Sequence, residues 1–359
     1  MMPRRVAGRL FFDACSTAWV WLRLLLPLLL CNQSGFLCPV RGTTANEAVA
    51  WWMAVDDSAQ RKYFSNVYSD ATWFASNGHG SLCVEAEAIL FTMRLSFTRQ
   101  PRQPLLIDVG ANTGNALAAM ISAFNQPGKG PVSVYAFEPN PESFVQLERG
   151  LAASGLAKHH NVTLIAAAVS DKVGRATFFH RGAGDLLAGL SRHPDRHLMP
   201  NAELEDRLVE VELVTLDSVF HQRGTSVHLL KVDAEGQDPL VLRGARRLLS
   251  RFQIKFIVFE YDVAWREAGH GLLPRDVIEE LRDLGYICFL MTSAALLPVF
   301  GMWWLNAYET ITWGNFFCGQ ERDHDLFDAY VSYGTNNYTL AFALTSLRSG
   351  SNKQFSWVH

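Results

Sequence analysis

The chain has 359 residues, of which 49% are hydrophobic and 19% are charged, and its formal net charge is −3. This composition excludes general disorder and suffices for one sizeable α/β domain with accessory segments. No block of basic residues that could follow a nucleic-acid backbone appears, so we expect no nucleic-acid partner.

Residues 1–31 are predicted to be a targeting segment. Three arginines precede a leucine-rich apolar stretch, which is the pattern of a secretory signal peptide. Residues 10–31 are also long enough to act as a signal anchor with single-pass membrane association, although Asp13 and Arg23 disfavour a spanning helix. We therefore expect a protein of the secretory pathway, either lumenal and membrane-anchored or secreted. Organelle targeting is the alternative.

Cysteine and histidine spacing gives little support for a metal site. Beyond the targeting segment, four cysteines allow three pairings, and a lumenal protein could use them as disulfides; they are Cys38, Cys83, Cys288 and Cys318. The sequence contains no Cys-x-x-Cys pair, which argues against a zinc ribbon. His193 and His197 have the spacing of a ligand pair on a helix, but Pro194 opposes a helix there. We expect no metal.

The rest of the chain divides into three parts. Residues 32–100 are rich in aromatic residues and helix formers, which predicts a small helical cap and a linker. Residues 101–320 form the main domain, and residues 321–359 form a C-terminal tail.

The main domain alternates strand and helix patterns. Short apolar runs predict strands at residues 105–109, 132–137, 162–168, 229–233, 254–260, 286–291 and 310–318. Apolar residues at helical spacing predict helices at residues 117–124, 240–249 and 274–284. This alternation predicts an α/β fold with a mostly parallel sheet. Residues 175–215 interrupt it with a predicted β-pair around a polar loop, an insertion of the kind that often lies over a site.

The first motif with chemical content follows the first strand of the domain. It reads Asp108-Val109-Gly110-Ala111-Asn112-Thr113-Gly114. Glycines here let the backbone turn and approach a ligand next to free helix N–H groups. A dinucleotide site would instead show Gly-x-Gly-x-x-Gly, which speaks against a nicotinamide dehydrogenase. Asp108 would repel a phosphate, but it suits an ammonium group such as that of S-adenosylmethionine.

Acidic residues also follow two further strands. Glu138 follows the second strand, where a carboxylate can accept hydrogen bonds from both hydroxyls of a ribose. Asp233 and Glu235 follow the strand at residues 229–233 and would face the same crevice, where they could orient or deprotonate a substrate hydroxyl. Lys231 could pair with one of them or lower its pKa. The alternative for these acids is an ion pair that caps the next helix.

Six blocks in order resemble the FkbM-type methyltransferases, and the resemblance covers roughly residues 101–320. The blocks are Asp108 to Gly114, Phe137-Glu138-Pro139-Asn140-Pro141, Ala168-Val169-Ser170-Asp171, Thr215-Leu216-Asp217, Lys231-Val232-Asp233-Ala234-Glu235-Gly236 and Phe259-Glu260-Tyr261. One departure is Gln237-Asp238, where the family usually has His or Asn followed by Glu.

The resemblance implies a Rossmann-like class I methyltransferase fold, with seven strands, helices on both faces and the last strand antiparallel. It implies S-adenosylmethionine as cofactor. Asp108, Gly110, Asn112 and Gly114 would then line the methionine part, Glu138 would hold the ribose, and Ala168 to Asp171, including Ser170, would flank the adenine. Thr113 and Pro139 are also expected to bind the cofactor. Asp233 and Glu235, with Lys231, would carry the chemistry.

The expected activity is O-methylation of a hydroxyl on a sugar, a glycan or a small-molecule acceptor. The alternatives are a catalytically silent cofactor-binding or scaffold protein of the same fold and an RNA methyltransferase. The silent protein could lose the acids at 233 and 235, and both are present. The RNA enzyme should show a basic face or an added binding module, and neither is evident.

Overall fold

The computed structural model describes residues 103–124, 130–198, 204–221, 224–291, 296–301, 304, 308, 313–323 and 325–326. All of them belong to one compact unit, Gln60–Ala341. The predicted targeting segment, the helical cap and nearly all of the predicted tail lie outside the described residues. Within the described ranges, no helix combines the length and the apolar character needed to cross a bilayer.

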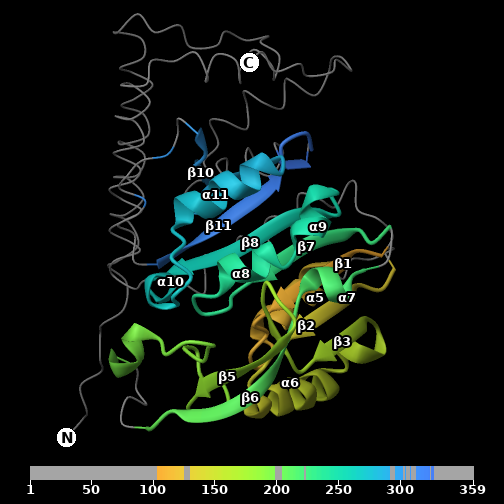
Figure 1. The fold of residues 1–359 in the computed structure, drawn as a ribbon. Helices are drawn as coiled ribbons and strands as arrows, with labels where there is room; N and C mark the ends of the chain where they lie inside the picture. Colours follow the sequence, from red (N-terminus) through yellow and green to blue (C-terminus); the bar gives the residue numbers. More distant parts are fainter. Residues whose placement is uncertain are drawn as a thin grey trace, which may run out of the picture. The chain divides into compact units, whose positions relative to one another are not determined.

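The main sheet has eight strands in the order β10-β9-β11-β8-β7-β1-β2-β3 (Figure 1). Their bounds are β1 Leu105–Val109, β2 Ser133–Phe137, β3 Asn161–Ile165, β7 Val227–Val232, β8 Ile254–Asp262, β9 Tyr286–Met291, β10 Leu296–Pro298 and β11 Trp313–Gln320. Neighbouring strands from β3 to β8 run parallel, whereas β11 pairs antiparallel with both β8 and β9. The predicted seven-stranded arrangement with an antiparallel last strand is confirmed, and the short β10 extends its edge.

Helices connect the parallel strands. They are α5 Asn115–Phe124, α6 Pro141–Ser154, α7 Leu216–Val219, α8 Asp238–Arg243, α9 Arg246–Ser250, α10 Ala264–Glu267 and α11 Pro274–Asp283, with 3₁₀ turns η2 Leu156–Lys158 and η3 Pro194–Leu198. Successive residues of a strand point to opposite faces. Leu106 and Ile107 of β1 are both fully buried, so both faces of the sheet are covered. Buried residues of α5 and α6 belong to the same cluster as Leu106.

Two predicted elements are divided in the structure. The run at 162–168 supplies β3 and then, after a break, β4 (Ala168–Val169), which belongs to a second sheet. The predicted helix at 240–249 is two short helices, α8 and α9, that meet around Gly244. The backbone of Gly244 lies so close to the residue after β4 that an added Cβ would be 2.0 Å from the carbonyl oxygen of Ser170.

The insertion forms the second sheet, in the order β4-β6-β5. β5 (Gly174–His180) and β6 (Arg207–Val214) pair antiparallel, as predicted, and β4 pairs parallel with β6. Phe178 and Val211 belong to its small apolar core. The chain between β5 and β6 includes residues 181–198, which are hereafter called the 181–198 segment.

Candidate functional site

The candidate site is a cavity of about 550 Å³ at the carboxyl ends of the parallel strands β1, β2, β7 and β8. This size lies within the range of small-molecule sites, and the carboxyl edge is where open α/β sheets bind ligands. Its walls come from the turns after these strands and from the 181–198 segment. Among the described residues, the wall includes seven carboxylates and no lysine or arginine; the seven are Glu138, Asp185, Asp195, Asp233, Glu235, Glu260 and Asp262.

Gly110 brings the turn after β1 against the turn after β7. Its φ is +80°, and a Cβ added to it would lie 1.8 Å from the carbonyl oxygen of Asp233. Only glycine fits this approach. The N–H groups of Gly110 and Ala111 both donate to the carbonyl oxygen of Phe137, so the turn is also tied to the end of β2.

Glu138 is held at the end of β2 by two backbone donors. The N–H of Asn112 donates to its Oε2 and the N–H of Asn140 to its Oε1, each at 2.7 Å. Burial raises the pKa of Glu138 to about 7, since these hydrogen bonds offset only part of the desolvation. Each carboxylate oxygen keeps a lone pair for a ligand hydroxyl.

Asp233 lies at the end of β7 and pairs with a buried lysine. Lys231 Nζ lies 3.1 Å from its Oδ2 and 3.5 Å from Oδ1 of Asp108. Burial would raise the pKa of Asp233, but the charge of Lys231 and hydrogen bonds from Glu260 and Lys231 lower it below its ordinary value. The Asp233 side chain is 26% exposed, so an ionised carboxylate reaches the cavity.

The pKa values of two neighbouring glutamates, Glu235 and Glu260, are shifted in the opposite direction. Burial raises the pKa of Glu235 and of Glu260 well above the ordinary value, and the charge of Asp233 raises both further. Glu260 also accepts a short hydrogen bond from the indole of Trp313. Among these three acids, the pKa of Asp233 is therefore lowered, whereas the pKa values of Glu235 and Glu260 are raised.

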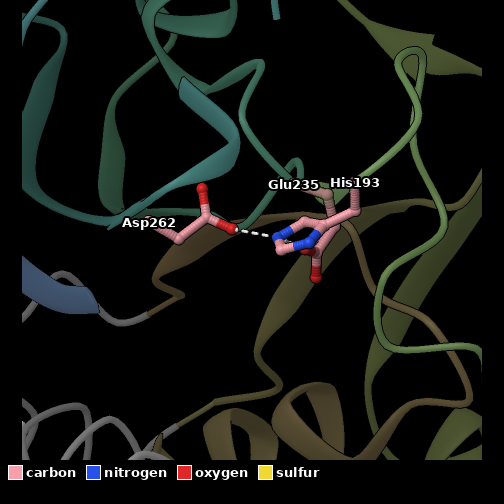
Figure 2. Close-up of side chains that lie close together, drawn as sticks. All are labelled: His193, Glu235 and Asp262. Carbon is pink, nitrogen blue, oxygen red and sulfur yellow. Dashed lines mark hydrogen bonds and ion pairs between the residues drawn. The ribbon is translucent and has the colours of Figure 1, made fainter. Parts of the chain in front are cut away.

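His193 of the 181–198 segment lies beside Glu235 and Asp262 (Figure 2). Its Nε2 is 2.6 Å from Oδ2 of Asp262 and 3.9 Å from a carboxylate oxygen of Glu235. Its Nδ1 accepts a hydrogen bond from the N–H of Asp195, so in the neutral ring the proton is on Nε2 and is donated to Asp262.

Two groups of side chains have ligand atoms close enough to share a metal ion. One is His193, Glu235 and Asp262, and the other is Asp233, Glu235 and Glu260. In the first group, both ring nitrogens of His193 are already engaged by hydrogen bonds. His197, which has the spacing of a second metal ligand beside His193, forms a hydrogen bond with the carbonyl oxygen of Pro194 instead.

The structure places six of the predicted site residues on the cavity wall; they are Gly110, Asn112, Glu138, Pro139, Asp233 and Glu235. Six others do not line the cavity; they are Asp108, Thr113, Gly114, Ser170, Asp171 and Lys231. Asp108 and Lys231 are buried beneath the wall as an ion pair. Ser170 donates its backbone N–H to Val214 and its hydroxyl to Asp171, so Ala168 and Val169 line the wall in its place.

Sequence reasoning missed several lining residues. It placed the insertion over the site, but it considered His193 only as a metal ligand and did not single out residues 185–190 or Asp262. Asp262 follows Glu260 by two positions in β8, so the alternation of a strand puts both on one face. This two-residue spacing from Glu260 is the signal by which the sequence could have predicted Asp262 as a lining residue. No local pattern reveals that His193 meets Asp262, 69 residues away.

The strand order, the antiparallel β11 and the cavity at the carboxyl edge define a Rossmann-like class I methyltransferase fold. The model of the methyltransferase FkbM domain matches residues 108–288, which is half of the chain. The chain therefore belongs to the FkbM methyltransferase domain family.

Solved structures with a similar arrangement share little sequence with the chain. The methyltransferase FkbM from Methylobacillus flagellatus is 16% identical, with a TM-score of 0.36, over 61% of this chain and 44% of that one. The chain thus spans less than half the length of that relative. The N-terminal domain of human METTL16 in complex with SAH is 10% identical, with a TM-score of 0.33, over 64% and 66% of the two chains. Precorrin-6y C5,15-methyltransferase from Geobacter metallireducens is 10% identical, with a TM-score of 0.32, over 66% and 87%. No curated protein matches the chain.

Proposed function

We propose that the chain is an S-adenosylmethionine-dependent O-methyltransferase that acts on a hydroxyl of a sugar, a glycan or another small molecule. The observation that carries the proposal is the ionised Asp233, held by Lys231 at the edge of an acidic cavity. Family membership supports methyl transfer, and the side chains of the cavity support a hydroxyl acceptor.

The cavity fits S-adenosylmethionine in size and in its donor set. Glu138 would hold the ribose, because its two oxygens keep acceptor capacity after binding two backbone N–H groups. The acidic lining suits a ligand with a sulfonium and an ammonium group, since opposite charges attract strongly away from bulk water. Ala168 and Val169 offer an apolar surface of the kind that suits a base.

When bound, S-adenosylmethionine supplies a methyl group on a positively charged sulfur. The contribution of the protein is to hold the acceptor in attack geometry and to receive its proton. Asp233 is the residue assigned to accept the hydroxyl proton, because its lowered pKa keeps the carboxylate ionised and its side chain reaches the cavity. Glu235, whose pKa is raised, would donate a hydrogen bond to an oxygen of the acceptor, whereas Glu260 donates to Asp233.

Calorimetric titration of the full chain with S-adenosylmethionine tests the cofactor assignment. We expect saturable binding by the wild type and at least a tenfold loss of affinity in Glu138→Gln, since an amide offers one acceptor oxygen where the carboxylate offers two. Glu210→Gln is the matched control, because Glu210 is exposed on β6 and pairs only with the exposed Arg175 among the described contacts. A well-folded wild type that does not bind would refute the proposal.

Binding without methyl transfer to any hydroxyl in a broad acceptor panel would favour the catalytically silent cofactor-binding protein instead. The retained acids Asp233 and Glu235, both on the cavity wall, argue against that alternative. The acceptor panel should include free sugars, glycosides and small alcohols.

A further inference from the structure

The 181–198 segment crosses from the cofactor-binding turns to the acidic end of the cavity. At its start, the side-chain amide of Asn140 donates to the carbonyl oxygen of Gly182 at 2.8 Å. The hydroxyl of Ser143 accepts from the N–H of Gly184 at 3.0 Å. These contacts tie one end of the segment to the chain that follows Glu138.

The middle of the segment is stiffened by a buried arginine. Arg196 is 3% exposed, and its guanidinium contacts the carboxylate of Asp185 at 3.1 Å and the carbonyl oxygen of Leu187 at 2.7 Å. A Cβ added to Gly189 would lie 3.4 Å from the backbone oxygen of Glu235, so the segment packs directly on the turn after β7. Residues of this segment line the cavity from Asp185 to Asp195.

The far end of the segment is bonded to β8 through a histidine. The His193 side chain is 4% exposed, and it donates from Nε2 to Asp262 at 2.6 Å. Asp262 is fixed in turn, because its other oxygen accepts from the N–H of Ala264 at 3.0 Å. A hydrogen bond to a buried carboxylate is among the stronger ones in proteins, and its loss leaves the acceptor desolvated.

We propose that His193 is a positioning residue whose bond to Asp262 holds the 181–198 segment as the wall over bound cofactor and so sets how long the cavity retains it. The inference rests on the proposed function, since it takes the cavity to hold S-adenosylmethionine and its product S-adenosylhomocysteine. The segment is held on both sides, by Asn140 and Ser143 at the cofactor turns and by Asp262 at the acids.

The test is the dissociation rate of S-adenosylhomocysteine from the full chain, measured by stopped flow. His193→Ala should release the ligand about tenfold faster, the effect of losing one charge-assisted hydrogen bond. His193→Gln should stay within about twofold of the wild type, because its amide can still donate to Asp262. His193→Asn, whose side chain is too short to reach Asp262, should resemble His193→Ala. It replaces the alanine variant in the measurement if that variant does not fold. His197→Ala, an exposed histidine of the same segment, is the control and should change nothing.

Hydrogen exchange of the backbone amides in the 181–198 segment gives a second readout that needs no ligand. Exchange should accelerate in His193→Ala and His193→Asn, and not in His193→Gln. An unchanged dissociation rate in His193→Ala, or a glutamine variant as fast as the alanine one, would overturn the inference. If the wild type does not bind S-adenosylhomocysteine, the proposed function fails and the retention role fails with it. The exchange rates would then report separately whether His193 fixes the segment.

Discussion

Glu138 shows how the environment of one residue changes its chemistry. The carboxyl group is buried beside two other acids, Asp108 and Asp233, and two backbone N–H groups do not fully compensate. Its pKa of about 7 places its ionisation within the working range of the protein. A group in this state couples ligand binding to pH.

The affinity for S-adenosylmethionine should therefore fall as the pH falls through about 7. Ribose hydroxyls donate to the ionised carboxylate, so binding favours that form and lowers the pKa of Glu138 in the complex. Binding then releases a proton at pH values just below 7, and protonation of the free protein weakens it. Calorimetry in buffers of different ionisation enthalpy measures this release, and Glu138→Gln should remove it. An affinity that is flat between pH 6 and 8 would contradict the role of Glu138.

Lys231 is a second residue whose replacement should change the stability of the protein. It is 1% exposed and pairs with the fully buried Asp108 and with Asp233, so Lys231→Met leaves both acids without this cation. We expect a loss of about 3–5 kcal/mol in the free energy of unfolding at pH 7. Because Lys231 depresses the pKa of Asp233, its contribution is present above the ordinary pKa of aspartate and is lost as the pH falls below it.

Urea denaturation at pH 7 and at a pH well below the ordinary pKa of aspartate measures the effect of Lys231→Met, and the deficit should be smaller at the lower pH. Lys172→Met, at an exposed position, is the control and should stay within about 0.5 kcal/mol of the wild type. Equal stability of Lys231→Met and the wild type at pH 7 would show that the ion pairs contribute little.

Among the elements, the turn after β1 is the most sensitive to a single added carbon. A Cβ at Gly110 would overlap the backbone of Asp233, whereas one at Gly155, the left-handed C-cap of α6, meets nothing within 4 Å. Gly155→Ala should therefore cost about 1–2 kcal/mol, the penalty of the left-handed conformation alone. Gly110→Ala should cost clearly more and should also weaken cofactor binding, because the turn must move. Thermal unfolding of the two variants compares them directly, and equal losses would show that the close contact is not a constraint.

The disulfide Cys288–Cys318 joins β9 and β11 at paired positions. The sequence left three pairings of four cysteines open; the structure shows this one bond, and Cys38 and Cys83 lie outside the described residues. Cys288→Ser should lower the free energy of unfolding by about 3 kcal/mol. The difference should vanish when the wild type is reduced, and chemical denaturation with and without reductant measures it.

A disulfide in this position fits our proposal that the protein works in the oxidising secretory pathway. Protein expressed with its N-terminal segment and recovered from the secretory compartment should carry Cys288 and Cys318 in oxidised form, as alkylation followed by mass spectrometry would show. Protein found only in a reducing compartment, with both thiols free, would contradict this location.

At the scale of the whole molecule, local sequence patterns predict the strands and helices. Contacts between residues that are distant in the sequence are not predicted. Buried strands such as 105–109 and 286–291 are predicted closely, because both their faces are covered and they appear as continuous apolar runs. The division of 240–249 at Gly244 depends on a contact with Ser170, which no local pattern contains. The residues that line the cavity show the same difference between local patterns and distant contacts. Glu138 and Asp233 follow strands and are found by position, whereas His193 lies on an irregular segment whose partner is fixed by the fold.

The proposed reaction depends most on Asp233 as the acceptor of the hydroxyl proton. The direct measurement is transfer of a labelled methyl group from S-adenosylmethionine to a panel of hydroxyl acceptors, with the wild type, Asp233→Asn and the exposed control Asp283→Asn. We expect transfer by the wild type and by the control. In Asp233→Asn the rate should fall about 10²–10⁴-fold, with cofactor affinity nearly unchanged. Full activity of Asp233→Asn would contradict the assigned base, and absence of transfer by a wild type that binds the cofactor would contradict the O-methyltransferase itself.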